Sequence, residues 1–215
     1  MFQPRYTITD KLLANIKRIN SQVSDLNNKR FSNVVLLELE RSAREVSSFA
    51  STSIEGNPLP LTEVKKILKS KPSHIRDSER EVLNYNQALQ DLNSKLAGGE
   101  IKLTLGLILN IQKQITAGLL PSFESGRLRE KAVIVNNPRT RQVVYLPPDV
   151  KDVKPLLENL IKFINENINV IDSLILAVVF HKQMVVIHPF MDGNGRTTRL
   201  VTKVLLAALG LNTFN

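Results

Sequence analysis

Cysteine is absent from the 215-residue chain, and its absence excludes disulfide bonds and thiolate chemistry. The start of the chain lacks the basic, apolar and small-residue pattern of a secretory signal. Long hydrophobic runs are lacking too, because His181-Lys182-Gln183 interrupts the most apolar stretch, 174–180, which is too short to span a bilayer. Repeats and low-complexity segments are missing as well. These absences predict a soluble, cytoplasmic protein with no membrane partner. The length of 215 residues allows one sizeable core, or one core with a helical extension.

The charge is strongly basic, with 29 lysines and arginines against 20 acidic residues and a net charge of +9. Such a charge is typical of some nucleic-acid-binding proteins. The basic residues are scattered, however, with modest clusters at 65–71 and 127–131, and no zinc-finger, basic-zipper or ribonucleoprotein pattern accompanies them. This distribution favours a solvated basic surface over direct nucleic-acid binding. It also suits attraction to ATP or to an acidic or DNA-associated protein.

Apolar residues recur at helical spacing along most of the chain, which predicts a mainly α fold. The second helix ends at Gly56-Asn57-Pro58 and is expected to pair Glu40 with Arg44 on its outer face. At the start of the fourth helix, Ser78 and Glu81 have the spacing of a capping box. Helices are expected at about 9–23, 32–54, 62–69, 77–96, 103–117, 149–166, 174–187 and after 195, and the predicted inner face of the second is Val35, Leu36, Leu39, Ala43, Val46 and Ala50.

Between about residues 131 and 146 the pattern changes to a two-residue alternation of β-branched side chains. The segments Ala-Val-Ile-Val and Gln-Val-Val-Tyr flank a polar turn, which predicts a β-hairpin. In a helical protein such a hairpin is either a structural edge ribbon or a docking strip, because an unpaired strand edge accepts an extended peptide.

Residues 188–199 read His-Pro-Phe-Met-Asp-Gly-Asn-Gly-Arg-Thr-Thr-Arg, and they combine several groups that phosphate chemistry needs. His188 is a candidate base and Asp192 a candidate cation ligand. Pro189 ends the preceding apolar helix, and the Gly193-Asn194-Gly195 turn starts the next one. The turn therefore offers free backbone N–H groups at a helix N-terminus, which is a favourable place for an anion.

Arg196 and Arg199 lie at positions i and i+3 of that last helix. This spacing predicts that both guanidinium groups project from one side of the helix, beside the turn. Two cations at a helix N-terminus oppose the helix dipole, so an anion is expected between them. A lone Gly-Asn-Gly or a lone histidine is usually structural. Their combination at this spacing favours a catalytic phosphate site.

The twelve residues resemble the signature of Fic-domain proteins at every position, and the chain is similar to the AMP-transferases of that family. The resemblance implies a Fic-type helical bundle whose hairpin is a flap, and transfer of AMP from ATP to a Ser, Thr or Tyr hydroxyl of a target protein, including the chain itself. It implies that His188 takes the hydroxyl proton, that Asp192 holds Mg²⁺, and that Phe190 packs inward to fix the loop.

The same resemblance assigns the nucleotide-binding residues. Gly193, Asn194 and Gly195 would surround the phosphates, and Arg196 and Arg199 would bind toward the β and γ positions. The similarity extends to two further segments, Glu81-Val82-Leu83-Asn84-Tyr85 and Gly126-Arg127-Leu128-Arg129.

A second motif, Ser51-Thr52-Ser53-Ile54-Glu55-Gly56, resembles the inhibitory helix of Fic proteins. Ser51 and Glu55 share one helical face, and a carboxylate in the last turn opposes the helix dipole unless a cation compensates. The resemblance implies that Glu55 pairs with Arg199 and prevents the γ-phosphate from binding productively. The alternative is a solvated glutamate at a frayed helix end.

The resemblance also suggests the domain organisation and the flap. Residues 1–100 would form an N-terminal helical region with the inhibitory helix at about 32–56, and residues 101–215 the catalytic core. Family members usually continue with further helices, so the core is interpreted as shortened at its C-terminus. The flap would pair with the target's backbone through Gln142, Val143 and Val144.

The first functional hypothesis is therefore a self-inhibited protein adenylyltransferase. The alternatives are removal of AMP at the same site, with Glu55 aligning a water, transfer of another nucleotide, and a non-catalytic nucleotide-sensing or interaction module. The intact His188 and Asp192 argue against a dead site. Assembly into a homo-oligomer is left open.

Overall fold

The computed structural model describes residues 2–99, 102–136, 140 and 142–208, and within them the chain is mainly helical, as predicted. The described elements are α1 (Asp10–Asn27), α2 (Asn33–Ile54), α3 (Leu61–Lys69), α4 (Asp77–Ala97), α5 (Leu105–Ile115), β1 (Val135–Asn136), β2 (Val143–Tyr145), α6 (Val150–Asn167), α7 (Ser173–Ile187) and α8 (Asn194–Ala208). Several boundaries follow from local chemistry. Thr9 and Ser32 cap α1 and α2 by accepting hydrogen bonds from Leu12 and Val35.

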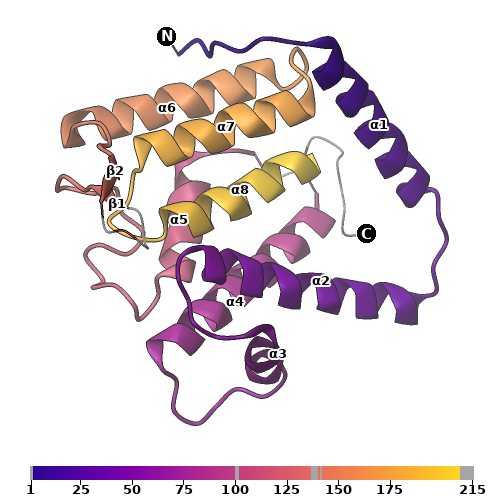
Figure 1. Ribbon diagram of the computed structural model, residues 1–215, viewed down its shortest axis with the longest axis vertical. Helices are drawn as coiled ribbons and strands as arrows, with labels where there is room; N and C mark the ends of the chain where they lie inside the picture. Colours follow the sequence, from indigo (N-terminus) through magenta and orange to yellow (C-terminus); the bar gives the residue numbers. More distant parts are fainter. Residues whose placement is uncertain (1, 100–101, 137–139, 141, 209–215) are drawn as a thin grey trace.

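Helix α8 lies at the centre of the arrangement and contacts α2, α4, α5 and α7 (Figure 1). Helices α6 and α7 pack side by side along one side of the molecule, while α1 lies at the periphery. Because α7 and α8 pack together, the loop that joins them is held at one end of the bundle. This loop, residues 188–193, carries the candidate base and cation ligand.

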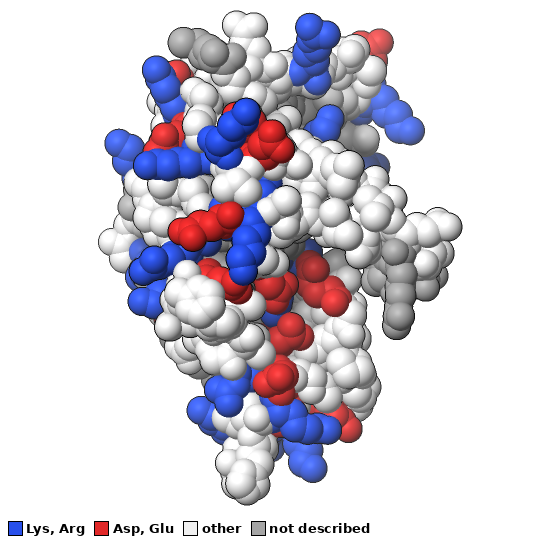
Figure 2. Space-filling view, turned by 90° about the vertical axis from the view of Figure 1, so that its left-hand side faces the viewer, with Lys and Arg blue, Asp and Glu red and all other residues white. Residues whose placement is uncertain are grey.

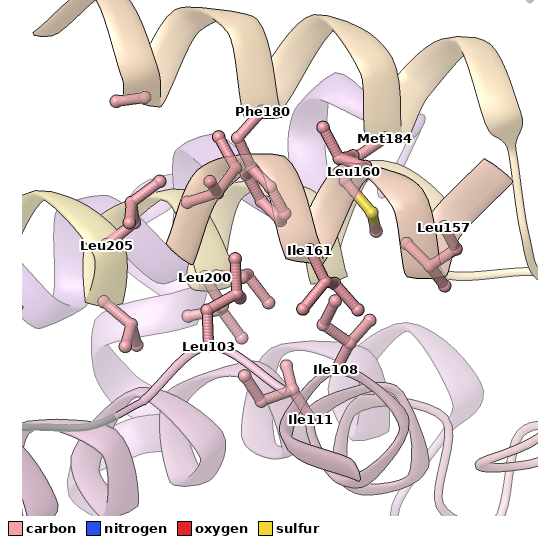
Figure 3. Close-up of a cluster of buried hydrophobic side chains, with 14 of the residues drawn as sticks. Leu103, Ile108, Ile111, Leu157, Leu160, Ile161, Phe180, Met184, Leu200 and Leu205 are labelled. Atoms are coloured by element: carbon pink, nitrogen blue, oxygen red, sulfur yellow. The ribbon is translucent and has the colours of Figure 1, made fainter. Parts of the chain in front are cut away.

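The main hydrophobic core lies between α4, α5, α6, α7 and α8 (Figure 3). Phe180 and Met184 of α7 are fully buried there, opposite Ile108 of α5 and Leu200 of α8. Helix α4 precedes the expected domain boundary near residue 100 but contributes Leu89 to this same core. A smaller cluster joins α3 to α4 through Leu59, Val64, Ile67 and Val82.

The predicted inner face of α2 is wrong at four of its six positions, which are exposed, whereas Leu36 and Ala43 are half-buried. Val35, Leu39 and Val46 are 43%, 52% and 46% exposed, whereas Ser48, Ser51 and Thr52 are buried. The reason is that α2 packs against α4 and α8 through small polar side chains. The Thr52 hydroxyl donates a hydrogen bond to the carbonyl of Ser48, and the Ser51 hydroxyl accepts one from Arg199.

The expected outward pair on α2 is wrong as well. Glu40 and Arg44 line a cavity of about 680 Å³ between α1, α2, α4, α7 and α8, and no ion pair joins them among the described contacts. Lys203 lines the same cavity, and burial lowers its pKa to about 8.

The capping box predicted from Ser78 and Glu81 does not form. Helix α4 begins at Asp77, so its N-cap is Arg76, two positions before Ser78, and the side chain of Glu79 accepts a hydrogen bond from the backbone N–H of Arg76 at 2.8 Å. Two charge-assisted bonds from the Arg76 guanidinium to Glu79 fix this start. Glu81 is thereby free to take part in longer-range contacts.

The predicted hairpin is present, although residues 137–139 and 141 lie outside the described residues. Strands β1 and β2 are antiparallel, with Val135 opposite Tyr145 and Asn136 opposite Val143. The Tyr145 hydroxyl donates a hydrogen bond to the carbonyl of Val186 at 3.1 Å, which fixes the hairpin near the end of α7.

On the face in Figure 2, lysine and arginine side chains are interspersed with acidic side chains. None of the helices in the described ranges has the length and apolar character needed to cross a membrane.

Candidate functional site

His188 ends α7 in a left-handed backbone conformation, with φ 48° and ψ 61°. Such a conformation is uncommon outside glycine and is kept only where surrounding contacts fix it. Its backbone N–H donates to Met184, and its carbonyl accepts from the guanidinium of Arg129. The ring is half-buried, and Nδ1 lies 3.4 Å from the carbonyl of Val185. A proton on Nδ1 that donates to this carbonyl leaves Nε2 as the basic nitrogen.

Burial is the main cause that lowers the pKa of His188, because it disfavours the imidazolium form. The nearby cation of Arg129 acts in the same direction, while the carboxylates of Glu55 and Asp192 act against it. The net effect is a neutral imidazole at neutral pH, as a general base requires.

The loop after His188 is closed by the side chain of Asn194. Its Oδ1 accepts from the backbone N–H of Phe190, and its Nδ2 donates to the carbonyl of Phe190, both at 2.9 Å. Phe190 is fully buried, in agreement with the structural role expected for it. Gly193 adopts φ +78°, which favours glycine, and a Cβ there would crowd Ile115. Because the Asn194 side chain forms both hydrogen bonds with the backbone of Phe190, it supports the loop from inside.

The N-terminus of α8 begins at Asn194, and its first backbone N–H groups have no acceptor within the helix. A carboxylate occupies the space above them. A Cβ placed on Gly195 would overlap with Oε1 of Glu55. The same oxygen accepts a hydrogen bond from Nη2 of Arg199 at 2.8 Å, and Arg199 also donates to the hydroxyl and the carbonyl of Ser51. The structure thus brings the predicted inhibitory residues, Ser51 and Glu55, against the predicted anion site.

The two arginines of the motif do not lie side by side as their spacing predicted. Arg199 contacts α2, whereas Arg196 is only 2% exposed and lies between two carboxylates. Its Nη1 donates to Glu81 of α4 and its Nη2 to Asp192, both at 2.9 Å. In this arrangement Arg196 orders the protein's own carboxylates, and its predicted contact with a nucleotide phosphate would require these bonds to change.

Asp192 has the chemistry of a Mg²⁺ ligand. Its side chain is 54% exposed, and one of its oxygens is bonded to Arg196. Within the described ranges, no group of three His, Cys, Asp or Glu side chains forms a complete metal site. Mg²⁺ is commonly bound by one or two carboxylates, with water and substrate phosphates as its other ligands. The single exposed carboxylate fits this mode.

Sequence reasoning missed three residues that support the site. Arg129 is 3% exposed and donates to the carbonyls of His188, Lys131 and Pro148, so it links loop 188–193, the candidate catalytic loop, to both ends of the hairpin. Gln112 of α5 is fully buried and donates to the carbonyl of Asp192. The third is Glu81. Glu81 and Arg129 lie in the two segments that carried the wider resemblance, which was the available signal.

The residues predicted for target docking are at the surface. Gln142 precedes β2, and Val143 and Val144 are 54% and 65% exposed. Each strand of a two-stranded sheet has an edge that faces away from its partner. The hairpin therefore presents backbone groups beside the end of α7, where His188 lies.

Comparison with known proteins agrees with this geometry. Residues 102–206 match the family model described as Fic/DOC family. Protein adenylyltransferase Fic of Drosophila erecta is 29% identical over 183 residues, which are 83% of this chain and 35% of that protein. The protein of the same name from Culex quinquefasciatus is 30% identical over 92% of this chain and 42% of its own length. The chain thus spans less than half the length of these relatives.

Solved structures give the same result. A Fic family protein from Desulfovibrio desulfuricans G20 is similar over 97% of this chain and 62% of its own, with a TM-score of 0.76 and 26% identity. Fic-1 from C. elegans is similar over 93% of this chain and 59% of its own, with a TM-score of 0.74 and 26% identity. The family match includes all of loop 188–193, and the helical arrangement around that loop is shared, so residues 102–206 belong to the Fic/DOC family.

Proposed function

We propose that this protein is an adenylyltransferase that moves AMP from ATP to a hydroxyl of a target protein and is held inactive by Glu55. The observation that carries the proposal is the Glu55 carboxylate, which lies over Gly195 and is bonded to Arg199. An anion already occupies the site that a phosphate would take. The name of the two relatives, protein adenylyltransferase Fic, supports adenylyl transfer as the reaction.

His188 supplies the proton chemistry of this reaction. Its neutral Nε2 takes the proton from the target hydroxyl while that oxygen bonds to the α-phosphorus of ATP. The bond between the α-phosphorus and the oxygen that bridges to the β-phosphate breaks, and pyrophosphate leaves with the electron pair. The products are AMP-protein, pyrophosphate and protonated His188. The Arg129 contact to the carbonyl of His188 keeps the ring in place during this step.

The remaining residues hold and neutralise the phosphates. The first N–H groups of α8 face the anion, and Arg199, once released from Glu55, adds a cation. Asp192 is the residue that would hold Mg²⁺, which supplies charge neutralisation for the phosphate oxygens. The exposed edge of the hairpin would hold the target's backbone beside His188.

Inhibition follows from competition between two anions for one site. With Glu55 in place, the anion site and Arg199 are both occupied, so a nucleotide phosphate meets a carboxylate of its own charge. Displacement of the end of α2 removes this carboxylate from the anion site and releases Arg199 at the same time.

Radiolabelled ATP tests the proposal without a known target, because self-modification reports the reaction. Glu55→Gly protein is incubated with Mg²⁺ and either α-labelled or γ-labelled ATP. The α-label is expected to become attached to protein and the γ-label is not. Glu55→Gly/His188→Ala protein is the control, and it should lose about 10²- to 10⁴-fold of the transfer.

The other outcomes contradict the proposal in distinct ways. Attachment of the γ-label would identify a phosphoryl transferase, and attachment only from another labelled nucleotide would change the substrate. Release of AMP from an AMP-modified protein, with no forward transfer, would favour removal as the reaction. Folded Glu55→Gly protein that binds ATP without transfer to itself or to lysate proteins would favour a nucleotide-sensing module.

A further inference from the structure

A chain of hydrogen bonds joins the end of the inhibitory helix to the proposed cation ligand. Asn57, which follows α2, donates from Nδ2 to Glu81 Oε2 at 2.7 Å and to the carbonyl of Ser78 at 2.8 Å. The other oxygen of Glu81 accepts from Arg196 Nη1, and Arg196 Nη2 donates to Asp192 Oδ2. Four side chains from α4, α8 and two loops thus form one connected network.

The charged side chains in this network differ in their exposure to solvent. Arg196 is 2% exposed, so its cation requires a carboxylate partner inside the protein. Glu81 is 23% exposed and Asp192 is 54% exposed. Asp192 is therefore the partner that can turn toward a ligand in solvent, while Glu81 stays with Arg196.

We propose that Glu81 is a positioning residue that balances the buried Arg196 and so allows Asp192 to bind a cation. This inference rests on the proposed function. If Glu81 lost its charge, Asp192 would be the one carboxylate bonded to Arg196 among the described contacts. A cation would then have to compete with Arg196 for that oxygen. Glu81 acts through Arg196 and Asp192, and it touches neither Mg²⁺ nor nucleotide.

Asn57 fixes the orientation of Glu81. Its own side chain is held by the backbone N–H of Leu59, which donates to Asn57 Oδ1 at 3.1 Å. With one Glu81 oxygen bound by Asn57, the other faces Arg196. A glutamine at position 81 would present its amide group to Asn57 or to Arg196, and two donors would then face each other.

The test measures binding, so no reaction is needed. The affinity for an ATP analogue with an α,β-methylene bridge is measured by titration calorimetry over a range of Mg²⁺ concentrations. Glu55→Gly protein is the reference, because its anion site is open. The Mg²⁺ midpoint is the Mg²⁺ concentration that gives half of the change in analogue affinity. In Glu55→Gly/Glu81→Gln protein this midpoint is expected to rise about tenfold or more, as it does when a residue hydrogen-bonded to a metal ligand is removed.

Glu79→Gln in the same background is the matched control. Glu79 lies on α4 two positions earlier and is also bonded to an arginine, Arg76, and the described hydrogen bonds and ion pairs include none between Glu79 and loop 188–193. Its Mg²⁺ midpoint should equal that of the reference. If Glu81→Gln protein does not fold, Glu81→Asp replaces it, since it keeps the charge but shortens the reach to Arg196, and the midpoint should move in the same direction.

Two results separate this inference from the proposed function. A Mg²⁺ midpoint unchanged by the folded Glu81 variant, with a clear Mg²⁺ effect in the reference, overturns the role of Glu81 alone. A reference protein that binds no analogue, or binds it without any Mg²⁺ effect, overturns the proposed nucleotide or cation site itself.

Discussion

At the residue scale, the site depends on buried polar side chains that hold the reactive groups from behind. Asn194 closes the loop on Phe190, and Arg129 fixes the carbonyl of the left-handed His188. Each of these side chains is nearly inaccessible to solvent, so its hydrogen bonds act without competition from water. The residues that would meet a substrate, His188 and Asp192, are more exposed.

The pH dependence of transfer should report the lowered pKa of His188. The reactive form is the neutral ring, so kcat/KM should be fully developed above this pKa and fall as the pH drops through it. We expect the midpoint of the acid limb below the ordinary histidine value of 6.5, because burial disfavours the imidazolium. Glu55→Gly protein is suitable, since it also removes a carboxylate that raises the pKa.

His181→Gln is the control for this profile. His181 is a second partly buried histidine, hydrogen-bonded to Thr202, and burial lowers its pKa also. Its replacement should leave the acid limb in place. A midpoint above 6.5, or a limb that disappears in His181→Gln protein, would assign the titration to another group.

Arg129→Lys should damage both stability and catalysis. One ammonium group does not reach the three separate carbonyls that the guanidinium contacts. Loss of such bonds to a charged donor should lower the free energy of unfolding by roughly 3 kcal/mol. Transfer should fall by about tenfold to hundredfold because His188 is less well placed. Arg127→Lys, two positions away and exposed, should leave both the melting temperature and kcat unchanged.

At the element scale, the end of α2 is held against the start of α8 by polar contacts. Ser51 and Glu55 accept hydrogen bonds from Arg199, and the buried face of α2 consists of Ser48, Ser51 and Thr52. Breaking polar contacts of this kind costs less free energy than removing large apolar side chains from a core. The proposed inhibitory element is therefore joined to the bundle in a way that suits reversible displacement.

Glu55→Gly should raise self-modification, by roughly tenfold to hundredfold if the coupling is of ordinary size. Arg199→Ala should not reproduce this gain, because it releases Glu55 but also removes a cation from the phosphate site. Initial rates of AMP incorporation measure both. Glu38→Gly, which removes an exposed carboxylate from the same helix, is the control and should have the wild-type rate. Equal rates for Glu55→Gly and wild-type protein that both bind ATP would leave Glu55 without an inhibitory role.

At the scale of the whole molecule, the catalytic loop has its position because α7 and α8 share one core with α4, α5 and α6. His188 ends α7 and Asn194 begins α8, so any shift between these helices moves the base relative to the anion site. The rigidity of the core is therefore part of the geometry of the site.

Phe180→Ala tests this connection. Phe180 is fully buried between the helices in Figure 3, and its truncation should reduce the free energy of unfolding by about 3–5 kcal/mol. Transfer by the remaining folded protein should decrease as well. Val178→Ala lies on the same helix but at a position that is 66% exposed, and it should change neither property. Thermal unfolding and transfer rates at a temperature where both variants are folded provide the comparison.

Local sequence by itself determined the form of the catalytic loop. Pro189 ends a helix, Gly193 permits the positive φ, and the following apolar periodicity starts a new helix with free N–H groups. The helices and the hairpin could be predicted for the same reason, since caps, turns and spacing act between residues close in the chain. The resemblance to Fic proteins added the partners of Glu55 and Arg199.

Only the tertiary structure decided which charged side chains pair with each other. Arg196 and Arg199 have similar local surroundings, yet one is buried against Glu81, 115 positions away, and the other meets Glu55. Likewise, α2 buries Ser51 where periodicity favoured Val46, because Arg199 supplies the partner for a buried hydroxyl. A buried polar or charged side chain takes its direction from its partner. Spacing along one helix carries no information about which distant segment provides that partner.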